Sequence, residues 1–327
     1  MRLLPLLRLP LLLPRPPSVS PSRLFSTPPA AFSAASLSAD PCAAAHLLTY
    51  ACGYPPSSFA AFLSPPAPLP AAGDPPREGW EEEFGRLLER HGGGEPVQYL
   101  VGSWDFHCLA EIICRAPVLI PRPETEQLVE RVISSLSSSP SSSPKPKRLL
   151  DIGTGTGCIP LAVGASLPNV EATGADLSPA AVALAGENAA KFRGQMLPGS
   201  SFEAVLCAAA ELRASGLAGF GVVTANPPYI PTATYHTLEP TVREHEDRLA
   251  LDGGGDGMDV TRQVLEFCAS GNGVECELHM ELDEGQPGKV LEACKRYKGF
   301  VGGRAWSDYA GRERFVEIEW SGEKGEV

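Results

Sequence analysis

Four consecutive residues, Asn226, Pro227, Pro228 and Tyr229, carry groups that can orient a planar nitrogen atom for methyl transfer. An amide or aromatic amine is a weak nucleophile because its lone pair is delocalised, so its hydrogens must be held with the lone pair facing the electrophile. The side-chain carbonyl of Asn226 can accept one hydrogen. The Pro227 carbonyl can accept another, since the prolines have a fixed φ and no backbone donor, and Tyr229 offers a flat face. We therefore expect Asn226, Pro227 and Tyr229 to be catalytic and all four residues to bind the substrate; an ordinary Pro-Pro turn is the alternative.

A glycine-rich loop precedes this motif in the chain. The sequence predicts a short buried strand at 148–152, a turn at 153–157 and a helix that starts at Cys158. The glycines let the backbone approach a nucleotide, and Asp151 near the strand end can position the cationic amino end of an amino-acid-bearing cofactor. The residues expected to bind the cofactor here are Asp151, Gly153, Thr154, Gly155, Thr156 and Gly157.

A second predicted strand, 170–175, is followed by Asp176, whose carboxylate can accept both hydroxyls of a ribose. This spacing fits a dinucleotide as well as S-adenosylmethionine. A dinucleotide loop of the form G-x-G-x-x-G would need glycine at position 158, however, where this chain has Cys158. Because a dehydrogenase has no use for Asn-Pro-Pro-Tyr after a later strand at 221–225, we predict S-adenosylmethionine as the cofactor.

The chain resembles the HemK-type (PrmC-type) N5-glutamine methyltransferases, which modify class I peptide-chain release factors. Besides the two motifs, the resemblance rests on segments 94–102, 120–126, 250–257, 281–286 and 308–314, and it covers roughly positions 94 to 320. It implies an α/β fold, in which a Rossmann-like, seven-stranded class I S-adenosylmethionine-dependent methyltransferase domain follows a small helical N-terminal domain. It also implies that the protein partner is a class I release factor, methylated on the glutamine of its Gly-Gly-Gln loop.

The resemblance also assigns roles to residues of this chain. Residues 153–157 and Asp176 would bind the cofactor, Asn226 would lie between cofactor and substrate, and residues 226–229 would bind the glutamine. The family usually places an acidic and an aromatic residue near the adenine, but segment 205–211 here reads Val-Leu-Cys-Ala-Ala-Ala-Glu. We therefore expect the adenine to be held more weakly, or by Glu211 instead.

The first 146 residues fall into three segments of different composition and expected structure. Residues 1–39 contain four arginines, many Ser and Pro, and no Asp or Glu, which is typical of an organellar transit peptide. We predict import into the mitochondrion, with the chloroplast as the alternative. Residues 40–95 are expected to form a helical N-terminal domain, with an amphipathic helix at 81–90. Residues 96–146 are expected to connect the domains through a flexible Ser/Pro-rich loop at 134–146.

The remaining segment, 147–322, alternates short β-type runs with Ala- and Leu-rich helical stretches such as 179–192. Such alternation predicts a parallel or mixed doubly wound sheet. The predicted strands are 148–152, 170–175, 222–225, 277–281 and 315–320.

The charge of the chain argues against a nucleic-acid substrate. The net charge is -12, and removal of the four arginines in residues 1–39 would make it -16. The one short basic stretch, 145–148, is too small to neutralise a phosphate backbone. Amino-methylation of rRNA or DNA is therefore an alternative, and so is a catalytically silent relative that binds a peptide, although the intact glycine loop argues against the latter.

Other classes of site and partner are disfavoured. The apolar run at 3–13 is too short to span a membrane and is interrupted by Pro and Arg. The nine cysteines include no C-x-x-C pair. We interpret His245-Glu246-Asp247 as a solvated loop, because adjacent residues rarely converge on one ion. No metal is expected, and we expect a monomer.

Overall fold

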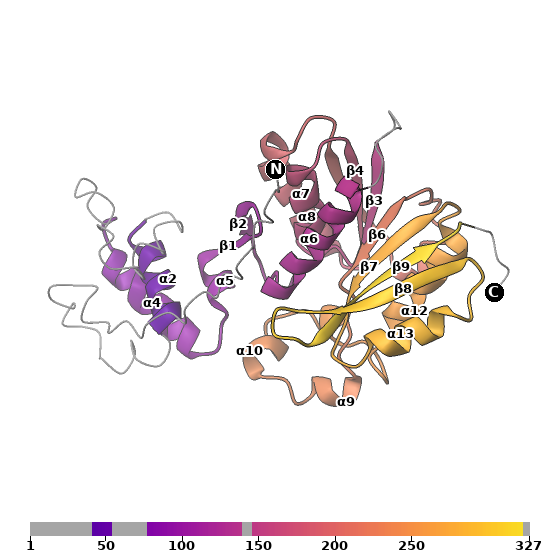
Figure 1. Cartoon of the computed structure of the whole chain (residues 1–327). Helices are drawn as coiled ribbons and strands as arrows, with labels where there is room; N and C mark the ends of the chain where they lie inside the picture. The colour runs from indigo at the N-terminus through magenta and orange to yellow at the C-terminus, as the bar shows by residue number, and fades with distance from the viewer. Residues whose placement is uncertain (1–40, 54–76, 139–145, 323–327) are drawn as a thin grey trace, which may run out of the picture. The chain divides into compact units, whose positions relative to one another are not determined.

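The computed structural model describes residues 41–53, 77–138 and 146–322 (Figure 1). The chain divides into two compact units, Met1–Gly93 and Gly94–Val327. The predicted transit peptide at 1–39 lies outside the described residues.

The first unit contains two helices, α2 (Pro41–Ala51) and α4 (Trp80–Gly92), which pack against each other. On α4, Phe84 and Leu87 are buried, while Arg86 is exposed and forms an ion pair with Glu83. Apolar residues three apart lie on one face of a helix. The amphipathic helix predicted at 81–90 is therefore confirmed, with slightly wider bounds.

The second unit begins with packed elements where the sequence suggested a connector. These are α5 (Val97–Val101), a hairpin of β1 (Ser103–Phe106) and β2 (Leu109–Ile113), and α6 (Pro123–Ser138). Their buried side chains, among them Phe106 and Leu128, share a core with Leu149 of the sheet. The described part of segment 96–146 therefore belongs to the body of this unit.

Helix α6 also extends into the stretch expected to be a loop. The hydroxyls of Ser137 and Ser138 donate to carbonyls four residues earlier, at 2.7 and 2.8 Å. Serines in a helix can bond back to the preceding turn in this way, which satisfies their polar groups without ending the helix.

The sheet of the second unit has seven strands in the order β5-β4-β3-β6-β7-β9-β8, which confirms the expected Rossmann-like fold. Strand β9 is antiparallel to both β7 and β8, and the pairs from β5 to β7 are parallel. The strands are β3 (Lys147–Ile152), β4 (Val170–Asp176), β5 (Ser201–Leu206), β6 (Val222–Ala225), β7 (Cys276–Glu281), β8 (Phe300–Ser307) and β9 (Glu313–Trp320).

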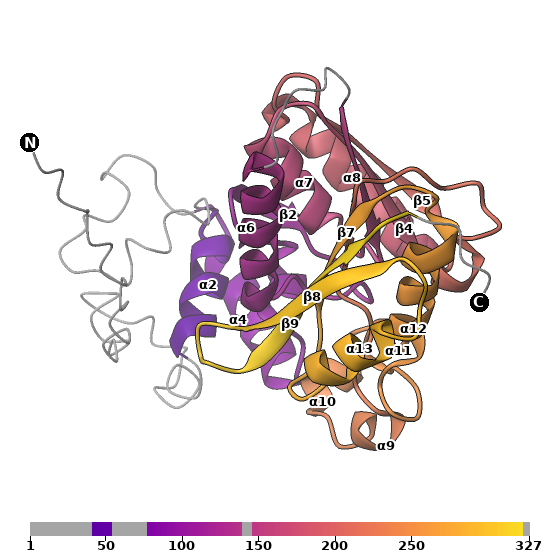
Figure 2. The same ribbon diagram turned by 45° about the vertical axis from the view of Figure 1, so that its right-hand side comes forward.

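Helices cover both faces of this sheet. Figures 1 and 2 show α6 and α7 on one side and α12 and α13 on the other. Successive side chains of a strand point to opposite faces, so Leu149 packs in the core beneath α6 and α7 while Leu150 packs in the core beneath α12 and α13. The remaining helices are α7 (Cys158–Ser166), α8 (Pro179–Phe192), α9 (Thr232–Tyr235), α10 (Pro240–Arg243), α11 (Arg248–Leu251), α12 (Asp259–Glu266) and α13 (Pro287–Cys294).

The strand order reverses between β3 and β6. From β3 the chain proceeds outward to β4 and β5, and it then returns to β6 on the other side of β3. Open α/β sheets bind ligands outside the carboxyl ends of the strands at such a switch point. Both predicted motifs follow these strands, so the topology brings them to one edge of the sheet.

Candidate active site

The glycine loop turns the chain from β3 into α7. The backbone nitrogens of Gly153 and Thr154 both donate to the Ala175 carbonyl, at 2.8 and 3.2 Å, and this ties the loop to the end of β4. Gly153 has φ +74°, and a Cβ built there would meet no heavy atom within 4 Å. Because Gly153 also lines a cavity, its missing side chain leaves room for a ligand against the backbone.

Asp176, the last residue of β4, lines the same cavity. Its two carboxylate oxygens accept from the backbone nitrogens of Gly155 and Ser178, each at 2.9 Å. Burial raises the pKa of Asp176, although these two backbone hydrogen bonds oppose the shift. Each oxygen can accept a further hydrogen bond, so the carboxylate is held in place with capacity left for ribose hydroxyls.

Asp151, the residue before Ile152 at the end of β3, does not line the cavity. It is 1% exposed, and its Oδ1 accepts from the Thr224 hydroxyl at 2.7 Å. Burial raises the pKa of the Asp151 carboxyl to about 6, although the Thr224 hydrogen bond opposes the shift. Within the described residues, Asp151 Oδ2 and Thr154 Oγ1 are buried without a hydrogen-bond partner. A buried carboxylate oxygen without a partner suits an additional donor such as an ammonium group.

The cavity at the switch point joins the two motifs. Gly153, Gly155, Asp176, Asn226 and Pro228 all line it, and the other predicted residues do not. Its further lining residues are Val118, Leu119, Ile152, Ala175, Leu177, Ser178, Ala181, Cys207, Ala208, Ala209, Asp247, Leu249, Ala250, Val260 and Gln263. An apolar wall with a few polar groups is typical of small-molecule sites. The open backbone at Gly153 and the Asp176 carboxylate, which can accept further hydrogen bonds, fit S-adenosylmethionine.

The segment expected to hold the adenine contributes backbone and small side chains. Cys207, Ala208 and Ala209 line the cavity, whereas Glu211 does not. The Glu211 carboxylate instead accepts from the backbone nitrogen of Ala208 at 3.3 Å. Glu211 therefore supports this wall indirectly.

Asn226 directly follows β6, and its carboxamide is held from one end. Its Nδ2 donates to the Thr125 hydroxyl over 3.1 Å, and that hydroxyl donates to Glu281 Oε2 over 2.7 Å. Thr125 and Glu281 are 3% and 1% exposed. Within the described ranges no group donates to Asn226 Oδ1 or to the Pro227 carbonyl. Two acceptors thus remain available: one belongs to Asn226, which lines the cavity, and the other to Pro227, which lies between the lining residues Asn226 and Pro228.

The Tyr229 side chain is fixed by Arg314 of β9. Arg314 Nη2 donates to the Tyr229 hydroxyl at 3.0 Å, and the guanidinium lies 5.5 Å from the ring centroid. The same nitrogen is 3.9 Å from Glu281 Oε1. Burial raises the pKa of Glu281 to about 7, although the Thr125 hydroxyl and the Arg314 charge oppose the shift. Arg314 therefore joins the tyrosine and the buried carboxylate in one cluster.

Loop 251–257 and Gln286 contact the backbone at and just after Tyr229. Gln286, just before α13, donates to the Tyr229 carbonyl at 3.0 Å and to the Gly257 carbonyl at 3.4 Å. A Cβ on Gly257, whose φ is +77°, would overlap the Tyr229 carbonyl oxygen. This close approach explains the need for glycine at that position.

Thr156 and Gly157 complete the predicted loop residues. Gly157 precedes α7 with φ +79°, and the Thr156 carbonyl accepts from Asn188 Nδ2 at 3.0 Å. Both residues shape the turn and lie outside the cavity lining. Thr125, Glu281 and Arg314 were not assigned a role from the sequence, although all three lie in segments that carry the family resemblance.

The segment His245-Glu246-Asp247 does not converge on one point, because each side chain contacts a different residue. The His245 ring lies 3.1 Å from the Thr241 carbonyl, and Asp247 accepts from the Leu249 backbone nitrogen at 3.0 Å. The interpretation as a solvated loop is wrong for Glu246, which is buried and bonded to Arg122 at 2.7 Å. In the described ranges, no group of three or more His, Cys, Asp or Glu side chains is placed to hold a metal ion.

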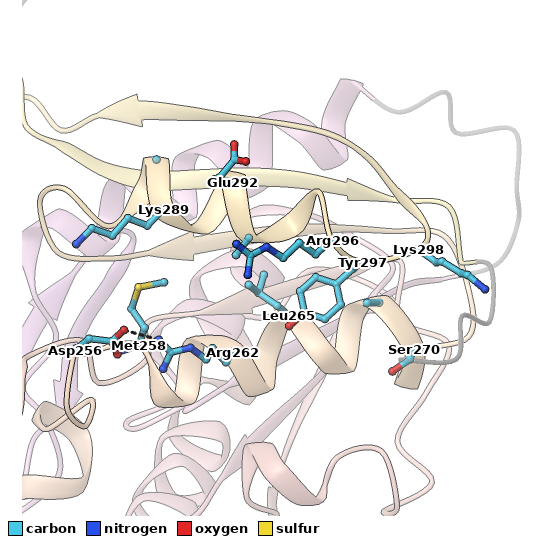
Figure 3. A pocket seen from close by; sticks show the side chains of 13 residues that line it. Asp256, Met258, Arg262, Leu265, Ser270, Lys289, Glu292, Arg296, Tyr297 and Lys298 are labelled. Atoms are coloured by element: carbon cyan, nitrogen blue, oxygen red, sulfur yellow. Dashed lines mark hydrogen bonds and ion pairs between the residues drawn. The ribbon is translucent and has the colours of Figure 1, made fainter.

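A second cavity lies between α12 and α13 (Figure 3). Met258, Leu265 and Tyr297 contribute its apolar surface, and Lys289, Arg296 and Lys298 lie around it. It contains none of the residues predicted to act on cofactor or substrate. For the part of the chain that the structure describes, no helix has the length and apolar character needed to cross a membrane.

Comparison with known proteins agrees with this geometry. The profile of the family described as "Methyltransferase small domain" matches residues 132–257. The chain is 36% identical to a release factor glutamine methyltransferase of Geobacter sulfurreducens over 70% of its length and 75% of the relative. It is 38% identical to the enzyme of that name from Deinococcus radiodurans, covering 72% of this chain and 78% of the relative. The human MTRF1L release factor glutamine methyltransferase is 33% identical, with 69% and 68% coverage. On these matches, the chain belongs to the release factor glutamine methyltransferases.

Proposed function

We propose that this protein transfers a methyl group from S-adenosylmethionine to the side-chain nitrogen of the glutamine in the Gly-Gly-Gln loop of a class I release factor. The observation that carries the proposal is the pair of acceptors beside the cavity, Asn226 Oδ1 and the Pro227 carbonyl. A primary carboxamide has two hydrogens on one nitrogen. The two acceptors match this pattern and would leave the nitrogen lone pair free to face the methyl donor.

The chain's own groups bind and orient the reactants. Gly153 and Gly155 leave space against the loop backbone, and Asp176 accepts from the ribose hydroxyls. Bound S-adenosylmethionine supplies an electrophilic methyl group on a sulfonium. Asn226 and Pro227 would hold the glutamine nitrogen toward that methyl group; an N–C bond would form as the C–S bond of the donor broke, and the nitrogen would then lose one proton to solvent. Such catalysis depends on position and electrostatics rather than on a general base.

The named relatives and the charge of the chain support a protein substrate. Release factor is part of the name of each relative described above. A net charge of -12 disfavours the alternative, an rRNA or DNA amino-methyltransferase, because phosphate backbones require neutralising Lys and Arg. We propose that the protein acts as a monomer, which light scattering coupled to gel filtration would test.

The decisive experiment uses the full chain, radiolabelled S-adenosylmethionine and a mitochondrial class I release factor. We expect label on the factor with its native Gly-Gly-Gln loop and none on the Gln→Ala factor. Label on both factors would place the modification elsewhere. Cofactor binding by calorimetry without any transfer would favour another substrate, which total RNA in the same assay would reveal. No cofactor binding would favour the silent peptide-binding alternative.

The proposed site of action is the mitochondrion, on the composition of residues 1–39, which contain four arginines and no acidic residue. A fluorescent protein fused behind these residues should enter mitochondria. Import into plastids would support the alternative organelle, and a diffuse signal would contradict an organellar address.

A further inference from the structure

The Asn226 carboxamide has two ends of nearly equal size and opposite chemistry. Its oxygen accepts hydrogen bonds and its nitrogen donates them. The proposed function, on which this inference rests, requires the oxygen to face the substrate amide. With the nitrogen there instead, two N–H groups would meet and the substrate could not be oriented. Some neighbouring group must therefore determine which end faces the cavity.

Two hydrogen bonds, which link Asn226 to Thr125 and Thr125 to Glu281 and are called the relay below, determine this orientation. Thr125 of α6 donates its hydroxyl hydrogen to Glu281 Oε2 over 2.7 Å and accepts from Asn226 Nδ2 over 3.1 Å. A hydroxyl has a single hydrogen. While ionised Glu281 accepts that hydrogen, Thr125 can offer Asn226 only a lone pair, so the donor end of the carboxamide must point toward Thr125.

We propose that Thr125 and Glu281 are positioning residues, which fix the Asn226 carboxamide with its oxygen toward the substrate. Neither residue needs to touch the substrate for this role. Both side chains are buried, which limits the access of water to replace either partner. The relay therefore determines the chemistry that the cavity presents at position 226.

The protonation of Glu281 is set by the groups around the end of β7. Arg314 of β9 approaches its Oε1 to 3.9 Å, and Thr125 of α6 bonds its Oε2. Burial, together with the nearby negative charge of Glu124, raises its pKa to about 7, while Thr125, Arg314 and Asn226 oppose that shift. A protonated Glu281 can donate to Thr125, which frees the threonine hydrogen for Asn226 Oδ1 and lets the carboxamide turn over.

The test compares Thr125→Val with Thr125→Ser. Valine keeps the shape but loses the hydroxyl, so we expect kcat to fall on the order of 100-fold, comparable with the loss of one orienting group in an active site. Serine restores the hydroxyl and should remain within about tenfold of the wild-type kcat, with the residual loss due to looser packing. S-adenosylmethionine affinity should change in neither variant. Thr261→Val, which alters a buried threonine of α12 away from the relay, is the matched control and should retain activity.

The pH profile separates positioning from simple packing. Wild-type kcat should rise with pH through about 7 as Glu281 ionises, and Glu281→Gln should have a low kcat without that rise. A normal kcat in Thr125→Val, or an unchanged pH dependence in Glu281→Gln, would overturn the proposal. Equal losses in the Val and Ser variants would show that only packing matters and would also overturn it.

The relay can also be tested without measuring catalysis, by hydrogen exchange of the Asn226 side-chain amide. In 15N-labelled full-length protein, the side-chain amide signals of Asn226, identified by their loss in Asn226→Asp, should exchange slowly with solvent. They should exchange at least tenfold faster in Thr125→Val, because the buried threonine hydroxyl that accepts from Nδ2 has gone. If wild-type protein methylated no glutamine, the proposed function would fail, yet these signals would still report the relay. Unchanged exchange in Thr125→Val would refute the relay alone.

Discussion

Gly174 on β4 lies directly against the side chain of Thr154 in the glycine loop. A Cβ at position 174 would come within 2.6 Å of Thr154 Oγ1 and 2.8 Å of its Cβ. The strand thus accommodates the loop at this point because it lacks a side chain, which couples the packing of β4 to the shape of the cofactor cavity.

Gly174→Ala should therefore destabilise the protein by about 1–3 kcal/mol, as is typical of overpacking, and should weaken S-adenosylmethionine binding because Thr154 must move. Gly186→Ala in α8 is the matched control, since a Cβ there meets nothing within 4 Å. It should be stabilising by about 0.5–1 kcal/mol. Urea denaturation and calorimetry measure both effects, and equal behaviour of the two variants would contradict the contact.

Asn226→Ala tests the acceptor beside the cavity. The change removes an orienting contact at the reacting centre, so kcat should fall by about 100- to 1,000-fold, while the dissociation constant of S-adenosylmethionine should change little. Lys289→Ala, in the cavity between α12 and α13, is a suitable control and should keep wild-type kcat. Normal turnover by Asn226→Ala would invalidate the assigned role of this residue.

Asp176→Ala tests ribose recognition. Loss of hydrogen bonds to a charged acceptor is worth about 1.5–3 kcal/mol, so cofactor affinity should fall by about tenfold to more than 100-fold. The variant also releases the backbone nitrogens of Gly155 and Ser178, which could loosen the loop by itself. A double-mutant cycle with S-adenosylhomocysteine and its 2′,3′-dideoxy analogue separates the two effects. If the hydroxyls interact with Asp176, their removal should weaken binding to the wild type and have little effect on the variant.

Asp151→Asn should have opposite effects on stability and on cofactor binding. The folded protein raises the pKa of this carboxyl from 3.8 to about 6, so the folded state binds more protons than the unfolded state between these values. The contribution of Asp151 to stability is thus fully present below pH 4 and is lost as the pH rises through 6. At pH 8 the neutral variant should be more stable than wild type, by up to about 3 kcal/mol.

The same variant should bind S-adenosylmethionine more weakly, because it lacks the negative charge expected to position the ammonium group. Urea titrations at pH 4 and pH 8, together with calorimetry at pH 8, measure these effects. If the difference in stability between Asp151→Asn and wild type did not grow with pH, burial would not raise the pKa of Asp151 as expected.

Local patterns were sufficient to predict several residues that line the cavity. The strand, glycine turn and helix at 148–163 are contiguous, and their signals depend on residues a few positions apart. Asp176 and Asn226 each follow a short apolar strand, β4 or β6. Because parallel strands end at a common edge, their approach follows from the fold class alone. The glycine loop, Asp176 and the Asn-Pro-Pro-Tyr motif could therefore be recognised from the sequence.

Two strands of the seven-stranded sheet, β5 and β8, were not predicted from the residue pattern, for a physical reason. Strand β5 is an edge strand without fully buried residues, and β8, at the other edge, contains Gly302 and Gly303. Edge strands bury little side-chain surface, so their apolar alternation is weak. The packed role of segment 96–138 was missed as well, since its hairpin is short and its partners lie far along the chain.

The sequence by itself determined which groups could bind the cofactor and accept the substrate's hydrogens, because these depend on residue type and local order. Only the tertiary structure decided how Asn226 is oriented. Its partner Thr125 is 101 residues away, and Thr125 in turn bonds Glu281 across 156 residues. Contacts of that separation form when α6 packs against the sheet beside β7. They leave no periodic signal in a single chain, since each residue satisfies only its own local pattern.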